Sequence, residues 1–219
     1  MRYPCFFLEE TDTSRLFLRR YKSSSDGQCP VHGYHDASVF LKDVPSRKEP
    51  VSDTDSRMVY ASHSDQMLPK DDPRWPVACD CGYVFASADE WQVFADALYQ
   101  RLDTGEILAR RAAPPGALWM AWWMKGFKSE WTGPDGEVLM CRTPGGDWNI
   151  DSRASNCTMP QDNTHRCWVR HGDPRDPLGL KSGKPLHVDK GGHTCQAGAG
   201  SIQCNSYHGF LHAGHLTEG

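Results

Sequence analysis

The chain has 219 residues, 38% of them hydrophobic, and a formal net charge of −4. This length supports one large domain or two small ones with a buried core, for which 8 Trp, 7 Tyr and 8 Phe supply bulky apolar surface. The acidic balance argues against a nucleic-acid partner, and no apolar run approaches the roughly 20 residues of a membrane span.

The first elements in chain order are predicted to be strands. Residues 4–22 are expected to form a β-hairpin, because two strand-like runs flank 11–14, whose Thr, Asp and Ser side chains favour turns. Residues 38–44 are a further strand candidate. Residues 45–76 are polar and contain five prolines, which indicates a loop-rich surface excursion with little regular structure.

One clear helix is predicted after Ser87. Ser87 and Glu90 have the spacing of a capping box, and apolar residues then recur at helical spacing until the segment ends near Gly105. The residues of this stripe, expected to pack against the sheet, are Trp91, Phe94, Ala95, Leu98 and Tyr99. A second, shorter helix is predicted over 114–124, since proline suits the first turn of a helix.

The remaining elements are predicted to be short strands joined by turns. These strands are expected at 130–132, 137–142, 167–169 and 186–188. Gly-Pro-Asp-Gly at 133–136 is a strong turn sequence. The predicted fold is therefore α+β and β-rich, with mostly antiparallel strands, one clear helix and metal-pinned loops, in a single domain over 1–219.

Cysteine and histidine recur in pairs at metal-ligand spacing. The pairs are Cys29 with His32, Cys79 with Cys81, His165 with Cys167, and His193 with Cys195. Residues i and i+2 of an extended strand point to the same side, so such a pair can offer two ligands to one ion. Structural zinc takes four nitrogen or sulfur ligands in a tetrahedron, and zinc is therefore the predicted cofactor.

The candidate ligands divide into two preferred sets, although the sequence leaves their pairing and the number of ions open. The first set is Cys29, His32, Cys79 and Cys81, and His35 is close by in the sequence. The second, weaker set is Cys157, His165, Cys167 and Cys195. Gly82 directly follows Cys81 and permits a tight turn in which backbone amides point at thiolate sulfur.

Nine cysteines also allow disulfides. A secretion signal needs a longer apolar run than residues 5–8, which Glu9 and Glu10 interrupt. We therefore expect a protein that is not secreted. In a reducing compartment, clustered cysteine and histidine bind metal more often than they form disulfides.

Three histidines near the end of the chain have helical spacing but are not expected to form a catalytic centre. His208, His212 and His215 follow an i, i+4, i+7 pattern, and two intervening glycines disfavour a helix there. We expect this segment to close the fold with partly exposed histidines. The side chains expected to pack inward are Tyr207, Phe210 and Leu211.

Several segments resemble uncharacterised, zinc-binding-like proteins encoded by tailed bacteriophages. The matching segments are 75–83 (WPVACDCGY), 148–152 (WNIDS), 165–172 (HRCWVRHG), 194–202 (TCQAGAGSI) and 207–211 (YHGFL). The resemblance covers most of the chain and implies a bacteriophage setting, in the host cytoplasm or the virion, without implying an activity.

The leading hypothesis is thus a non-enzymatic, zinc-stabilised phage protein that binds other phage proteins, as a virion component or in the infected cell. It rests on the abundance of structural-site ligands and on the lack of a complete catalytic set in the sequence. One alternative is a zinc-dependent hydrolase with a His/Cys site, which requires three protein ligands and an open position for water. Another is a nucleic-acid module that stacks bases on Trp119, Trp122 and Trp123, against which the acidic charge argues.

Overall fold

The computed structural model describes residues 1–22, 29–30, 33–126, 131–133, 135–154, 157–159, 161–162, 165–189 and 201–219. Within these ranges the chain forms strands and short 3-10 helices but no α-helix, and it contains no helix that could cross a membrane. The predicted β-rich fold with mostly antiparallel strands is confirmed, whereas the predicted helix is wrong.

The chain divides into two compact units. The first unit consists of Met1–Glu10, Pro50–Val59 and Tyr99–Gly219, and the second of Thr11–Glu49 and Tyr60–Leu98. Two long strands, β2 (Phe6–Tyr21) and β6 (Glu90–Arg101), run through both units. This division does not test the expectation of a single domain, which stays a prediction.

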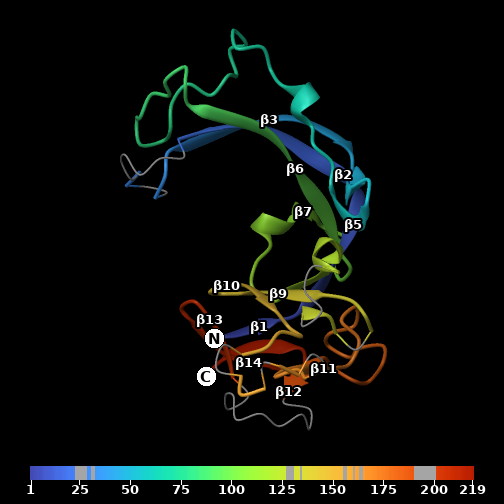
Figure 1. Cartoon of the computed structure of the whole chain (residues 1–219). Coiled ribbons are helices and arrows are strands. Elements are labelled where there is room, and N and C mark those ends of the chain that lie inside the picture. Colours follow the sequence, from blue (N-terminus) through green and yellow to red (C-terminus); the bar gives the residue numbers. More distant parts are fainter. Residues whose placement is uncertain are drawn as a thin grey trace. The chain divides into compact units, whose positions relative to one another are not determined.

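The first unit contains a four-stranded antiparallel sheet in which the two ends of the chain meet (Figure 1). Its order is β1-β15-β14-β13. The strands are β1 (Arg2–Pro4), β13 (Ile202–Cys204), β14 (Tyr207–His212) and β15 (His215–Glu218). The N-terminal amine lies 2.8 Å from Oε2 of Glu218, so an exposed ion pair joins the two ends.

The larger sheet has seven strands in the order β10-β9-β8-β2-β6-β7, with β3 paired to β2. Its other strands are β3 (Asp36–Pro45), β7 (Ile107–Ala109), β8 (Ala117–Met120), β9 (Leu139–Thr143) and β10 (Gly146–Asn149). The β2–β8 pair is parallel, and the pairs β2–β3, β8–β9 and β9–β10 are antiparallel. The β3 strand confirms the prediction for 38–44.

Two-stranded ribbons and short 3-10 helices complete the described structure. The ribbons pair β4 (Lys48–Ser52) with β5 (Asp55–Tyr60), and β11 (Val169–His171) with β12 (His187–Asp189). The 3-10 helices are η1 (Ser64–Gln66), η2 (Arg110–Ala112) and η3 (Trp122–Met124). The β4–β5 ribbon lies inside the polar excursion at 45–76, for which the sequence indicated little regular structure.

The main hydrophobic core belongs to the first unit. Its fully buried members include Phe7, Leu118, Leu139, Ile150 and Leu186, together with Trp148 and Trp168 whose rings meet edge to face at 6.1 Å. Such aromatic pairs add about 0.5–1.5 kcal/mol beyond the burial of their area. The core also buries Cys167, and Cys157 packs against it.

The segment after Ser87 is strand β6, because residues 86–89 form a turn and not a helix start. The Asp89 carboxylate accepts hydrogen bonds from the Ala86 amide (2.7 Å) and the Tyr83 hydroxyl (3.2 Å). A carboxylate that binds an amide three residues back fixes a local turn. Asp89, and not the Ser87–Glu90 box, therefore decides the local structure.

Sheet pairing also overrides the helical spacing of the apolar stripe. Phe94 stacks on Phe17 of β2, with ring centroids 5.4 Å apart and planes at 17°. Leu98 and Tyr99 are buried as predicted, but Trp91 is 37% exposed. Aromatic and β-branched residues suit the pleated surface of a sheet, and this tertiary pairing outweighs a weak helical propensity.

Two further predictions of local structure are wrong for the same reason. Residues 4–22 do not form a hairpin, since β2 continues through the expected turn and the Thr11 hydroxyl donates to the Leu98 carbonyl (2.9 Å). Residues 114–124 do not form a helix, since β8 pairs with β2 and β9 before the single 3-10 turn of η3.

The end of the chain alternates between buried and exposed residues. Along β14, Tyr207 and Leu211 are buried, whereas His208 and His212 are exposed, in line with the prediction. Phe210 was expected to pack inward and is 39% exposed. Because successive side chains of a strand point to opposite faces, Phe210 cannot share the buried face of its neighbour Leu211.

Candidate metal centres

Four potential ligands gather in the second unit, where the β2–β3 pairing ends. They are Cys29, His35, Cys79 and Cys81, whose ligand atoms all lie within 4.8 Å of one another. We call this group the Cys29 cluster. The Lys22 amide donates to the His35 carbonyl (3.0 Å) directly after β2, which places His35 at the end of the strand pair.

A tight turn presents the two cysteines of the Cys79–Cys81 step. The Cys79 amide donates to the Tyr83 carbonyl and the Gly82 amide donates to the Cys79 carbonyl, both at 2.8 Å. Ala78 and Val84 form a β-bridge at the base of this turn. Gly82 has φ +91°, in the region that L side chains rarely adopt. The glycine thus permits the turn that the sequence predicted.

Arg20 closes the base of the same hairpin. Its guanidinium donates to the carbonyls of Pro76 (3.0 Å) and Ala86 (2.5 Å), on either side of the turn. The group also lies over the rings of Phe85 (5.1 Å) and Trp75 (5.9 Å). A charged side chain that is 93% buried against these groups holds the two arms of the hairpin together.

The spacing of the donors matches a tetrahedral ion. Cys29 Sγ lies 3.8 Å from Cys79 Sγ, and Cys81 Sγ lies 3.2 Å from His35 Nδ1. Two sulfurs bound to zinc at about 2.3 Å in a tetrahedron are about 3.8 Å apart, whereas a disulfide requires about 2.05 Å. The His35 ring stacks on Tyr83 at 4.2 Å, which fixes its orientation.

The electrostatics of the Cys29 cluster favour a cation. Burial opposes ionisation of Cys79, but hydrogen bonds from the Cys81 and Asp36 amides and from His35 outweigh it and lower the pKa of this thiol. The Tyr83 amide lowers the pKa of Cys81, yet burial and the two neighbouring thiols outweigh that bond and raise it. A positive ion bound between neighbouring thiols stabilises their charged forms and relieves the repulsion between them.

The first predicted ligand set is thus largely brought together. Cys29, Cys79 and Cys81 lie in the cluster, and His35 is its histidine. The sequence analysis named His35 only as a neighbour, because its spacing from Cys29 matches no short ligand motif. His32 lies outside the described residues.

Three members of the second predicted set also meet, in the first unit. The ligand atoms of Cys157, His165 and Cys167 lie within 4.8 Å of one another, and we call them the Cys157 cluster. His165 Nε2 lies 3.5 Å from Cys167 Sγ. Both residues are at most 2% exposed, whereas Cys157 is half-buried. Cys195, the fourth predicted ligand, lies outside the described residues.

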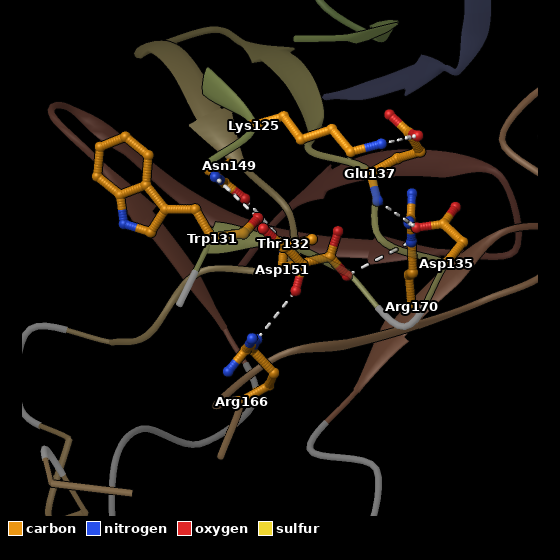
Figure 2. A network of polar contacts seen from close by, with 9 residues as sticks. All are labelled: Lys125, Trp131, Thr132, Asp135, Glu137, Asn149, Asp151, Arg166 and Arg170. Atoms are coloured by element: carbon orange, nitrogen blue, oxygen red, sulfur yellow. Dashed lines mark hydrogen bonds and ion pairs between the residues drawn. The ribbon is translucent and has the colours of Figure 1, made fainter. Parts of the chain in front are cut away.

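Local hydrogen bonds and one bond to a distant segment hold the loop that carries the Cys157 cluster. Arg166, between the two buried ligands, donates through Nε to the Thr132 carbonyl (3.1 Å). Arg153 donates to the Met159 carbonyl (3.2 Å), and the His165 amide donates to Oδ1 of Asp162 (3.2 Å). Of these three contacts, the Arg166–Thr132 bond is the one that reaches a distant segment, and it belongs to the network in Figure 2.

Asp151 is the buried acid of this network. It is 1% exposed, and its Oδ1 lies 3.4 Å from Arg170 Nε. Burial raises the pKa of Asp151 to about 7, against the opposing attraction of Arg170. Figure 2 shows Arg170 between Asp135 and Asp151, and Arg166 hydrogen-bonded to the Thr132 carbonyl. A Cβ at Gly133 would lie 2.8 Å from Oδ2 of Asp151, so a side chain there would have to displace the pair.

The sequence analysis missed a third group of potential ligands, the His171 cluster. It consists of His171, His187 and Asp189, whose ligand atoms lie within 4.8 Å of one another on the exposed β11–β12 ribbon. The His-Val-Asp step at 187–189 has the same i, i+2 spacing as the predicted pairs. The spacing of His187 and Asp189 could have predicted this group. The sequence analysis considered only cysteine and histidine as ligands and therefore missed it.

The described residues also bear on the alternative chemistries. None of the eight cysteines within the described ranges forms a disulfide. Trp119 is fully buried and cannot stack on a base, and Trp122 donates through Nε1 to the Glu10 carboxylate (2.5 Å). One of the three tryptophans proposed to stack on bases, Trp119, is therefore inaccessible to nucleic acid.

No family model, no curated protein and no solved structure matches this chain. The resemblance to bacteriophage proteins therefore stays a prediction.

Proposed function

We propose that this chain is a zinc-stabilised, non-enzymatic protein that binds another protein, and that the Cys29 cluster holds a structural zinc ion. One observation carries the proposal: four soft donors from separate segments converge, with two sulfurs 3.8 Å apart as zinc requires. Catalytic zinc is held by three protein ligands and keeps a position for water, whereas structural zinc is closed by four.

The burial of the donors supports a structural role. Cys29 and Cys79 are 2% and 3% exposed and His35 is 8% exposed, while Cys81 is half-buried. An ion enclosed in this way has little access to a substrate. Within the part of the chain that the structure describes, Phe85 is the one large apolar side chain buried in the surrounding cluster. The apolar packing there is slight, and the energy of metal binding is therefore folding energy.

Exposed aromatic side chains support a protein-binding role. In the second unit Tyr34 is 51% exposed and Phe40 on β3 is 46% exposed. Arg19 lies over the rings of Tyr21 (5.2 Å) and Tyr34 (5.1 Å). Tyr and Arg are enriched among the residues that carry binding energy at protein interfaces. On the bacteriophage resemblance, we propose another phage protein as the partner.

The metal content of purified variants tests the proposal. Cys79→Ser is expected to lower the zinc content by one equivalent and to lower the melting temperature, because a ligand of a folding-coupled ion is lost. Cys204→Ser is the matched control, since Cys204 belongs to none of the described ligand groups. Equal zinc content and equal melting in Cys79→Ser and the wild type would reject a structural zinc at this cluster.

A further inference from the structure

We propose that the His171 cluster is a separate, solvent-open binding site for a divalent transition-metal ion. The ribbon geometry brings its three side chains together. His171 pairs directly with His187 in the antiparallel β11–β12 register. Asp189 follows His187 by two residues, so both side chains lie on the same face of β12.

The core fixes which way that face points. Leu186 and Val188, which alternate with His187 and Asp189 along the chain, are buried in the main hydrophobic core. The alternation of a strand then directs His187 and Asp189 away from the core. The ligands therefore stand on a backbone that is anchored from the opposite side, and the site is held in place before an ion arrives.

The donor atoms have the spacing of ligands around one ion. Asp189 Oδ1 lies 3.0 Å from His171 Nε2, and Asp189 Oδ2 lies 3.6 Å from His187 Nε2. Nitrogen and oxygen ligands bound at about 2.1 Å, at angles between octahedral and tetrahedral, are about 3.0 to 3.4 Å apart. The shorter distance falls in this range and the longer one lies just above it. The two imidazole rings stack, with centroids 4.7 Å apart and planes at 20°, so both Nε2 atoms face the same carboxylate.

The ligand types indicate the class of ion. Two imidazoles and one carboxylate suit zinc, nickel, copper or ferrous iron and do not select the softer ions that thiolates prefer. The side chains of His171, His187 and Asp189 are 43%, 36% and 53% exposed. An ion held by these three ligands would keep positions for water, unlike an ion enclosed by the Cys29 cluster.

A neighbouring strand supplies a further imidazole. The ring centroid of His212 on β14 lies 5.8 Å from that of His187, and the planes meet at 62°. His212 is exposed and in ring contact with His187, so a third imidazole borders the three ligands. Of the three histidines with helical spacing near the end of the chain, His212 is the one in ring contact with this group.

Nickel binding by the full chain, carrying its zinc as purified, tests the proposal without touching any cysteine. Wild type is expected to bind one Ni²⁺ ion by titration calorimetry, and His187→Ala to bind it about 100-fold or more weakly, since even the partners that orient a ligand are worth 10- to 100-fold. Asp189→Asn should weaken binding by about tenfold or more. His208→Ala, an exposed histidine of β14 outside the cluster, should bind as wild type does.

Two results would overturn the site. Wild type that takes up no nickel, or His171→Ala and His187→Ala variants that bind it as tightly as wild type, would reduce the cluster to a hydrogen-bonded His–Asp pair. All these substitutions fall on exposed or half-buried positions, so unchanged melting serves as the check on folding. The proposal does not depend on the structural zinc: Cys79→Ser tests that ion alone, and each of the two claims can fail while the other holds.

Discussion

The Cys29 cluster and the Cys157 cluster use the same kinds of ligand but are held in place by different forces. In the first, backbone amides of a tight turn set two of the ligands, and Arg20 closes the base of the hairpin through backbone carbonyls. In the second, side chains such as Arg153 and Arg166 support an irregular loop. The first cluster gathers its ligands from separate segments, from Cys29 to Cys81, whereas the three ligands of the second lie within residues 157–167.

The largest expected difference separates the ligands of the two clusters. Cys29→Ser should destabilise the protein by more than about 3 kcal/mol, because it removes a buried ligand of a folding-coupled ion. Cys157→Ser should cost less, since Cys157 is half-buried and packs at the edge of a large core that persists without it. Urea unfolding of both variants, with zinc content measured on the same samples, checks this order. Equal losses of unfolding free energy in the two variants would mean that the two clusters contribute equally to stability.

The buried acid of the Figure 2 network gives a pH-dependent test. The pKa of Asp151 is raised from 3.8 to about 7, so between these values the folded protein holds a proton that the unfolded chain releases. The stability of wild type relative to Asp151→Asn should therefore fall as the pH rises from 4 to 7, by up to about 1.4 kcal/mol per pH unit. Any loss of metal at acidic pH is common to both proteins and cancels in the difference. A difference that does not change with pH would show that Asp151 titrates normally.

A methyl group at Gly133 should disturb the same network by contact. Its Cβ would meet Asp151 and Arg170, and overpacking of this kind costs about 1–3 kcal/mol. Gly136→Ala is the comparison, since a Cβ there meets nothing and costs only the strain of φ +78°, about 1 kcal/mol. Melting curves of the two variants measure the contrast. If Gly133→Ala proves as stable as wild type, the loop is looser than the contacts imply.

The smallest expected effect concerns the turn before β6. Asp89→Ala should cost about 1 kcal/mol, because the Ala86 amide and the Tyr83 hydroxyl lose their acceptor. Ser87→Ala should stay within about 0.5 kcal/mol, as for other surface positions. Urea midpoints of the two variants give the comparison. A larger loss of stability in Ser87→Ala than in Asp89→Ala would show that the Ser87 side chain, and not the Asp89 carboxylate, stabilises this segment.

The correct sequence predictions share a local cause. The Cys79–Cys81 turn depends on Gly82, which is adjacent in the chain, and the β3 strand follows from a short β-prone run. In the same way, alternation along β14 buries Tyr207 and Leu211. Each of these structures is specified by residues within a few positions of one another.

The wrong predictions share a non-local cause. The stripe in β6 is compatible with a helix until its pairing with β2 is known, and Phe94 finds Phe17 from 77 positions earlier in the chain. His35 joins the cysteines because β2 and β3 end together, which no spacing rule encodes. The His171 cluster likewise arises from the register of two strands that are separated by a long loop.

The most direct test of the central claim is X-ray absorption at the zinc edge, measured on the Cys157→Ser variant so that the Cys29 cluster dominates the signal. Three sulfur ligands at about 2.3 Å and one nitrogen ligand at about 2.0 Å are expected, from Cys29, Cys79, Cys81 and His35. An ion surrounded by oxygen and nitrogen alone, or a protein that folds normally without zinc, would contradict the account.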